Sequence, residues 1–125
     1  VFAKDLNTQI QKNISLIMGH ISFNGVLPTG NIDSKIVETL DLSSQHMLED
    51  TLLEDYEMTD WLIYEGNDAQ IASKYCRVFE QKFVKWCEEH DLRISMKTEI
   101  QFLNRLSDLM FYVGLYHQLT YERML

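Results

Sequence analysis

The chain has 125 residues, of which 46% are hydrophobic and 24% are charged. This length and composition fit one globular domain, residues 1–125, and exclude an intrinsically disordered chain. Its 19 acidic residues exceed its 11 basic residues, for a net charge of −8, which argues against nucleic acid or an anionic membrane surface as a partner.

The first two elements in chain order read as helices. Apolar residues recur at steps of three and four over residues 2–23, which is the period of an amphipathic helix. The stretch "FNGVLPTGN" (23–31) then interrupts the pattern with two glycines and the single proline. Asn31 or Asp33 is expected to cap a second helix, whose apolar positions extend to Leu53.

The stretch "TDWLIYEGND" (59–68) marks the second interruption. Asn67 followed by Gln70 has the pattern of a capping box and predicts the start of a third helix there. That helix is expected to end near "EEHDLR" (88–93). Cys76 and Cys87 would then lie about 16 Å apart along one helix axis, too far to form a disulfide, which favours reduced thiols and a cytoplasmic location.

A fourth helix is expected from about Ser95 to near the C-terminus. It carries two apolar stripes, and a helix that is apolar on two sides is normally buried on two sides. The first stripe (Ile100, Leu103, Leu106, Met110 and Val113) should face the bundle, and the second (Phe102, Leu109, Tyr112 and Tyr116) a neighbouring subunit. The sequence therefore predicts an all-α, antiparallel bundle of four to five helices. It contains no run of 18 apolar residues and hence no expected membrane span.

Several common kinds of site can be excluded from spacing. Di-metal helical bundles use Glu-x-x-His pairs, but none of the four histidines here has a glutamate three residues before it; those positions hold Ile17, Ser43, Cys87 and Gly114. Cys87 and His90 alone are too few to hold zinc. No Gly-x-Ser-x-Gly elbow and no phosphate-binding Gly-rich loop with lysine is present. We therefore expect no metal site.

The third and fourth helices each carry a polar group of residues among apolar ones. Arg77, Glu80 and Gln81 lie within one turn of the third helix. They are either exposed charges on a core helix or an anion site in which Glu80 orients Arg77 through an ion pair three residues apart. Asn104 and Asp108 share one face of the fourth helix between its apolar rows, so we expect them to be structural or to face a ligand.

Three segments resemble one enzyme family. "FLNRLSDLMF" (102–111) is similar to the "YLNRLSDxLF" segment of PduO-type ATP:cob(I)alamin adenosyltransferases, and "CRVFEQKF" (76–83) resembles their "CRRAERRV". "WLIYEGNDAQIASKYCR" (61–77) resembles the "FILPGGSxxAAxLHxARxxCR" that precedes it. The three segments occur in the family's order and separation, within residues 61–113.

The resemblance implies a trimer of helical bundles with its substrates, ATP (with Mg) and a corrinoid, bound between subunits. In this family the reduced cobalt of cob(I)alamin attacks the 5′ carbon of ATP, which forms adenosylcobalamin and releases triphosphate. The resemblance assigns Arg77 to contact with ATP as the catalytic residue. It also places Glu80, Gln81 and Asn104 in the nucleotide site.

The same resemblance gives roles to three further residues. Trp61 matches the aromatic residue before the family's "LPGG" turn and would lie on the corrinoid side. Arg105 and Asp108 would hold neighbouring helices or subunits in register.

The chain also departs from the family pattern. Ser73, Val78 and Gln81 stand where the family has arginines, and Tyr64 and Glu65 replace the Pro and Gly of its turn. The Thr- and Gly-rich ATP loop "TRTGDxGxT" has no counterpart here, so we expect the chain to lack an N-terminal ATP-binding segment. Fewer cations predict weak ATP binding. Two alternatives stay open: a non-catalytic bundle of the same fold that serves binding or assembly, and an unrelated helical interaction domain.

Overall fold

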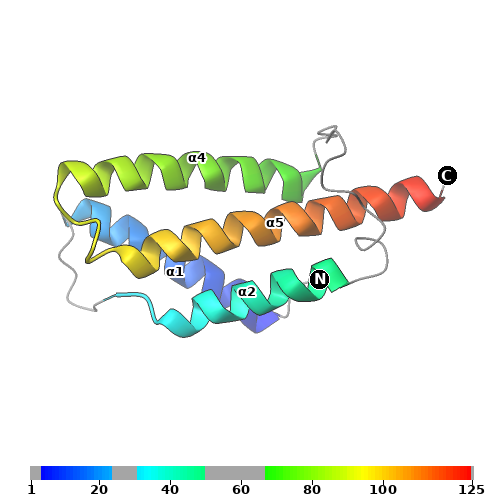
Figure 1. The fold of residues 1–125 in the computed structure, drawn as a ribbon, viewed down its shortest axis with the longest axis horizontal. Helices are drawn as coiled ribbons and strands as arrows, with labels where there is room; N and C mark the ends of the chain where they lie inside the picture. The colour runs from blue at the N-terminus through cyan, green and yellow to red at the C-terminus, as the bar shows by residue number, and fades with distance from the viewer. Residues whose placement is uncertain (1–3, 24–30, 50–66, 125) are drawn as a thin grey trace.

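The computed structural model describes residues 4–23, 31–49 and 67–124, and within these ranges it contains four helices and no strand. They are α1 (Lys4–Ser22), α2 (Ser34–Glu49), α4 (Asp68–Glu89) and α5 (Lys97–Met124). Successive helices run in opposite directions along one long axis (Figure 1). The predicted all-helical bundle is confirmed. Across the described ranges, no helix combines the length and apolar character needed to cross a bilayer.

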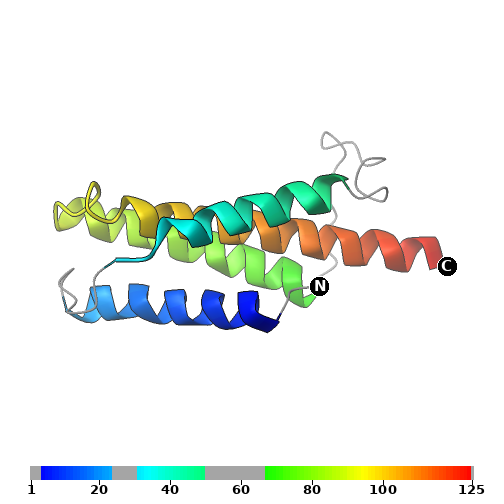
Figure 2. The same ribbon diagram turned by 90° about the horizontal axis from the view of Figure 1, so that it is seen from below.

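Helix α5 forms the centre of the bundle. It packs closely against α4 on one side and α2 on another, and both views show it between these two helices (Figures 1 and 2). Phe102 and Leu109 are therefore in the core of this chain, with 0% and 1% of their surface exposed. The prediction that their stripe faces a neighbouring subunit is wrong for these two residues, because α5 has neighbours within its own chain on both apolar sides.

The start of α2 is fixed by two carboxylates. Asp33 Oδ1 accepts a hydrogen bond from the backbone amide of Lys35 at 3.0 Å, which satisfies one of the unpaired donors at a helix N-terminus. One residue earlier, the amide of Ile32 donates to Glu99 Oε1 at 3.3 Å. Glu99 lies in the first turn of α5 and is fully buried, so this bond joins the beginnings of α2 and α5.

Both ends of α4 follow recognised capping patterns. The predicted capping box is present, since Asn67 Oδ1 accepts from the Gln70 amide at 2.9 Å and Gln70 Oε1 accepts from the Asn67 amide at 3.3 Å. At the other end, Asp91 has a φ of 57° and the Leu92 amide donates to the Cys87 carbonyl at 2.7 Å, which is the hydrogen bond of a Schellman motif. A short turn segment up to Met96 follows, and α5 begins at Lys97, within two residues of the predicted start near Ser95.

Candidate nucleotide-binding site

A polar pocket of about 200 Å³ lies on one side of the α4–α5 pair. Helix α4 and helix α5 contribute three residues each: Arg77, Glu80, Gln81, Asn104, Ser107 and Asp108. All four residues that the resemblance places in the nucleotide site thus line one pocket. Their spacing explains this, because antiparallel helices that pack along their length bring one turn of α4 beside one turn of α5.

The guanidinium of Arg77 lies close to an acidic and to an aromatic side chain of α5. Its Nη2 atom is 3.7 Å from Asp108 Oδ1, and its Cζ atom is 5.6 Å from the centroid of the Phe111 ring. The predicted ion pair of Arg77 with Glu80 is therefore wrong; Arg77 pairs across to the next helix. Both side chains of the pair are about half exposed, so this contact orients Arg77 more than it stabilises the fold.

Glu80 belongs to a separate polar network that crosses three helices. Asn104 Nδ2 donates to Glu80 Oε2 at 3.4 Å, and Asn104 Oδ1 accepts from Arg105 Nη1 at 2.6 Å. Arg105 Nε in turn lies 3.6 Å from Asp41 Oδ1 on α2. The amide of Asn104 is thereby fixed in its orientation, and Arg105 connects α5 to α2.

Ser73 is a buried contact between α4 and α5, at a position where the family has arginine. Its side chain is fully buried, and its hydroxyl donates to the Ser107 carbonyl at 2.9 Å. The Ser107 hydroxyl donates to the Asn104 carbonyl at 2.8 Å. An arginine at position 73 would need space and partners that this helix contact does not offer.

The charge of the polar pocket limits how well it can bind an anion. Arg77 is the one cation among the six lining residues, whereas Glu80 and Asp108 are both acidic. A triphosphate needs positive charge or hydrogen-bond donors around it, and Gln81 and Val78, both exposed, supply no charge where the family has arginines.

Burial, with smaller contributions from Glu80 and Asp108, raises the pKa of the adjacent Cys76 thiol to about 11, so that thiol is neutral at physiological pH.

Metal ligands are not gathered at this pocket or elsewhere in residues 4–23, 31–49 and 67–124, where no group of three His, Cys, Asp or Glu side chains could hold an ion. The two carboxylates of the pocket are each engaged by a neighbour, Asn104 or Arg77. Mg²⁺ in nucleotide sites is commonly held by substrate phosphates with only one or two carboxylates.

One predicted site residue cannot be placed, and two residues near the polar pocket were not predicted. Trp61, assigned to the corrinoid side, lies outside the described residues. Ser107 was not predicted as part of the pocket, although its position three residues after Asn104 places it on the same helix face. Phe111, four residues after Ser107, extends that face and completes the surroundings of Arg77.

Comparison with protein families gives a match to the model of the cobalamin adenosyltransferases over residues 3–117. The chain belongs to the cobalamin adenosyltransferase family. The matched range includes all four described helices except the last turns of α5. No curated protein and no solved structure gives a significant match. The family membership agrees with the resemblance carried by the three segments. Two of those segments, residues 76–83 and 102–111, contribute every residue that lines the polar pocket.

Proposed function

We propose that this protein is a corrinoid adenosyltransferase that transfers the 5′-deoxyadenosyl group of ATP to cob(I)alamin, giving adenosylcobalamin and triphosphate. The observation that carries the proposal is the convergence of Arg77, Glu80, Gln81 and Asn104 on one pocket in a chain of the cobalamin adenosyltransferase family. In this reaction the Co–C5′ bond forms as the C5′–O bond to triphosphate breaks. The nucleophile is cob(I)alamin itself, so no protein base is required.

The described residues contribute by positioning and by charge. Arg77 neutralises part of the charge on the departing triphosphate, and Asp108 and Phe111 hold its guanidinium towards the pocket. Asn104, fixed between Glu80 and Arg105, offers its remaining hydrogen-bonding capacity to the nucleotide. Gln81 adds a neutral donor and acceptor at the rim. Holding ATP in one orientation is the main contribution that such a site makes to a direct displacement.

The pocket itself does not balance the charge of ATP. One guanidinium faces two carboxylates, so the six residues carry a net charge of −1, counted as +1 for Arg77 and −1 each for Glu80 and Asp108. We therefore propose weak binding of Mg-ATP by this 125-residue chain and little turnover without further donors from another subunit or segment. In this proposal the corrinoid lies on the side of Trp61.

Assembly as a homotrimer is part of the proposal, with the substrates bound between subunits. Support comes from α4, where Ile71, Tyr75 and Val78 form an apolar stripe at steps of four and three and keep 41%, 69% and 40% of their surface exposed. Such a stripe is typical of a surface that another molecule covers. We also propose a cytoplasmic location, which is supported by the two free thiols, Cys76 and Cys87.

The direct test of this function is a transfer assay with the full-length gene product, Mg-ATP and chemically reduced cobalamin under anaerobic conditions, followed by chromatographic detection of adenosylcobalamin. We expect product in the wild type and at least a tenfold lower rate in Arg77→Ala. Arg93→Ala is the matched control, because Arg93 pairs with Glu88 at the far end of α4 and lines no part of the polar pocket.

A second function is favoured by one specific observation, the acidic balance of the pocket. A relative that has lost arginines at positions 73, 78 and 81 could retain the fold and serve as a non-catalytic binding or assembly protein. Absence of both product and Mg-ATP binding in the full-length protein would establish this alternative, whereas ATP binding without product would point to a defect in corrinoid binding.

A further inference from the structure

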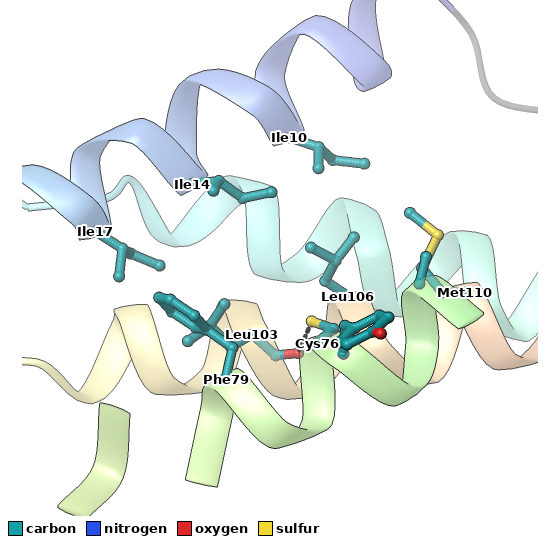
Figure 3. Close-up of a pocket in the computed structure, with 10 residues that line it drawn as sticks. Ile10, Ile14, Ile17, Cys76, Phe79, Leu103, Leu106 and Met110 are labelled. Carbon is teal, nitrogen blue, oxygen red and sulfur yellow. Dashed lines mark hydrogen bonds between the residues drawn. The ribbon is translucent and has the colours of Figure 1, made fainter. Parts of the chain in front are cut away.

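A second cavity lies beneath α1 (Figure 3), and the residues of α4 and α5 that line it are on different helix faces from those of the polar pocket. Its volume is about 360 Å³. Three isoleucines of α1 form one wall, Ile10, Ile14 and Ile17, and they point towards Phe79 of α4 and Leu106 of α5 across the gap (Figure 3). The apolar cavity shares no lining residue with the polar pocket.

The chemistry of the walls disfavours ordered water as an occupant. A buried water needs two to four polar partners. Apart from Tyr75, whose side chain is 69% exposed, the polar side-chain group in the lining is the Cys76 thiol. That thiol already donates to the Leu103 carbonyl, with an Sγ–O distance of 3.4 Å, and its pKa of about 11 keeps it protonated. The cavity therefore offers almost nothing to which a water molecule or an ion could bond.

The volume sets the size of the occupant. An engineered, enclosed apolar cavity of about 150 Å³ stays free of water and binds benzene. This cavity is more than twice as large and is open to solvent on one side, beside the exposed Tyr75. It is far too small for a corrin macrocycle with its side chains. Transfer of an apolar molecule from water into such a space is favourable in proportion to the apolar area that it buries.

We propose that the cavity between α1, α4 and α5 is a binding site for one small, uncharged, apolar molecule, such as a substituted benzene. The ligand would contact the isoleucine wall of α1 on one side and Phe79, Leu103 and Met110 on the other. The adjacent residues, Glu80 and Asn104, face the polar pocket. The site is thus separate from the proposed nucleotide site and does not depend on the proposed function.

The test uses toluene as the probe and protein labelled with ¹³C in the isoleucine δ1 methyl groups. We expect the signals of Ile10, Ile14 and Ile17 to shift in a saturable, one-to-one titration. Ile94, with 92% of its surface exposed, is the internal control and should not shift. Equal, non-saturating shifts of Ile94 and the three cavity isoleucines would overturn the proposal.

Variants with larger side chains in the cavity test whether toluene binds there. Ala72 lines the cavity from α4, so Ala72→Leu should weaken toluene binding at least tenfold, and Ile14→Phe should do the same from the opposite wall. Lys74→Leu, which adds a similar side chain to the exposed side of α4, should leave the affinity unchanged. Helix content by circular dichroism identifies any variant that fails to fold. If folded Ala72→Leu or Ile14→Phe binds toluene as tightly as the wild type, the ligand lies elsewhere and the proposal is wrong.

Discussion

Restoring the family's three arginines one at a time, at positions 73, 78 and 81, should affect Mg-ATP affinity and stability differently, because the surroundings of the three positions differ. Ser73 is fully buried and its hydroxyl bonds to the Ser107 carbonyl. Gln81 is exposed at the rim of the polar pocket, and Val78 retains 40% of its surface exposed. We therefore expect Gln81→Arg to improve Mg-ATP binding with little effect on stability, Val78→Arg to leave the fold of the single subunit intact, and Ser73→Arg to destabilise the fold severely.

The magnitudes follow from charge and burial. Gln81→Arg changes the pocket from one cation against two carboxylates to two against two. A charge-assisted hydrogen bond contributes about 1.5–3 kcal/mol, and solvent screening at an exposed rim places this one at the low end, so Kd should fall about tenfold. Ser73→Arg buries an uncompensated charge, which costs several kcal/mol, and loses a hydrogen bond of about 1 kcal/mol. That is a large part of the stability of about 5–15 kcal/mol of a typical domain.

Isothermal titration calorimetry measures the affinity for Mg-ATP, and urea unfolding of the same samples measures stability. Gln11→Arg adds the same charge to the exposed surface of α1, outside the polar pocket, and is the control for net charge. The reasoning is refuted if Ser73→Arg unfolds at the same urea concentration as the wild type, or if Gln81→Arg and Gln11→Arg change ATP affinity equally.

Three further predictions concern single contacts. Gly114→Ala should lower stability by about 1–3 kcal/mol, since a Cβ atom there would lie 2.7 Å from Gln70 Cγ and 3.0 Å from its backbone nitrogen; an unchanged melting temperature would contradict this close packing. Asp108→Ala should cost under about 1 kcal/mol of stability, because its pair with Arg77 is half exposed; a larger loss in urea unfolding would show a buried role. The pKa of Cys76 is about 11 in the folded protein, against an ordinary value near 9, so folding favours the protonated thiol. The stability that the protonated thiol contributes is complete below pH 9 and is lost as the pH rises towards 11. Urea unfolding at pH 8 and 10.5 should therefore show a smaller loss in Cys76→Ala than in the wild type.

Local signals in the sequence were sufficient for much of the fold, whereas the family resemblance brought Arg77, Glu80, Gln81 and Asn104 together as one site, and Ser107 was not predicted. The Asn67–Gln70 capping box fixed the start of α4 because both hydrogen bonds lie within four residues. Arg77, Glu80 and Asn104 converge because helical spacing and antiparallel packing together place them side by side. In these cases the determining interactions are local or repeat with the helix period.

The partners of individual side chains were not predictable in the same way. Phe102 and Leu109 were assigned to a subunit contact, yet both are buried in a chain whose own α4 and α2 pack against α5. Periodicity shows which side of a helix is apolar and gives no information on what covers it. Arg77 pairs with Asp108 and not with Glu80. Which of two nearby carboxylates an arginine pairs with depends on side-chain conformation and on the separation of the two helices. The apolar cavity likewise depends on how closely α1 approaches its neighbours.

The central claim is that Arg77 belongs to a site that binds ATP, and calorimetric titration of the full-length gene product with Mg-ATP tests it most directly. Wild-type protein, Arg77→Ala and the control Arg93→Ala would be compared under one buffer and salt condition. Our interpretation predicts one-to-one binding in the wild type and in Arg93→Ala, with at least a tenfold loss of affinity in Arg77→Ala. Equal ATP affinity in Arg77→Ala and the wild type would contradict the site assignment.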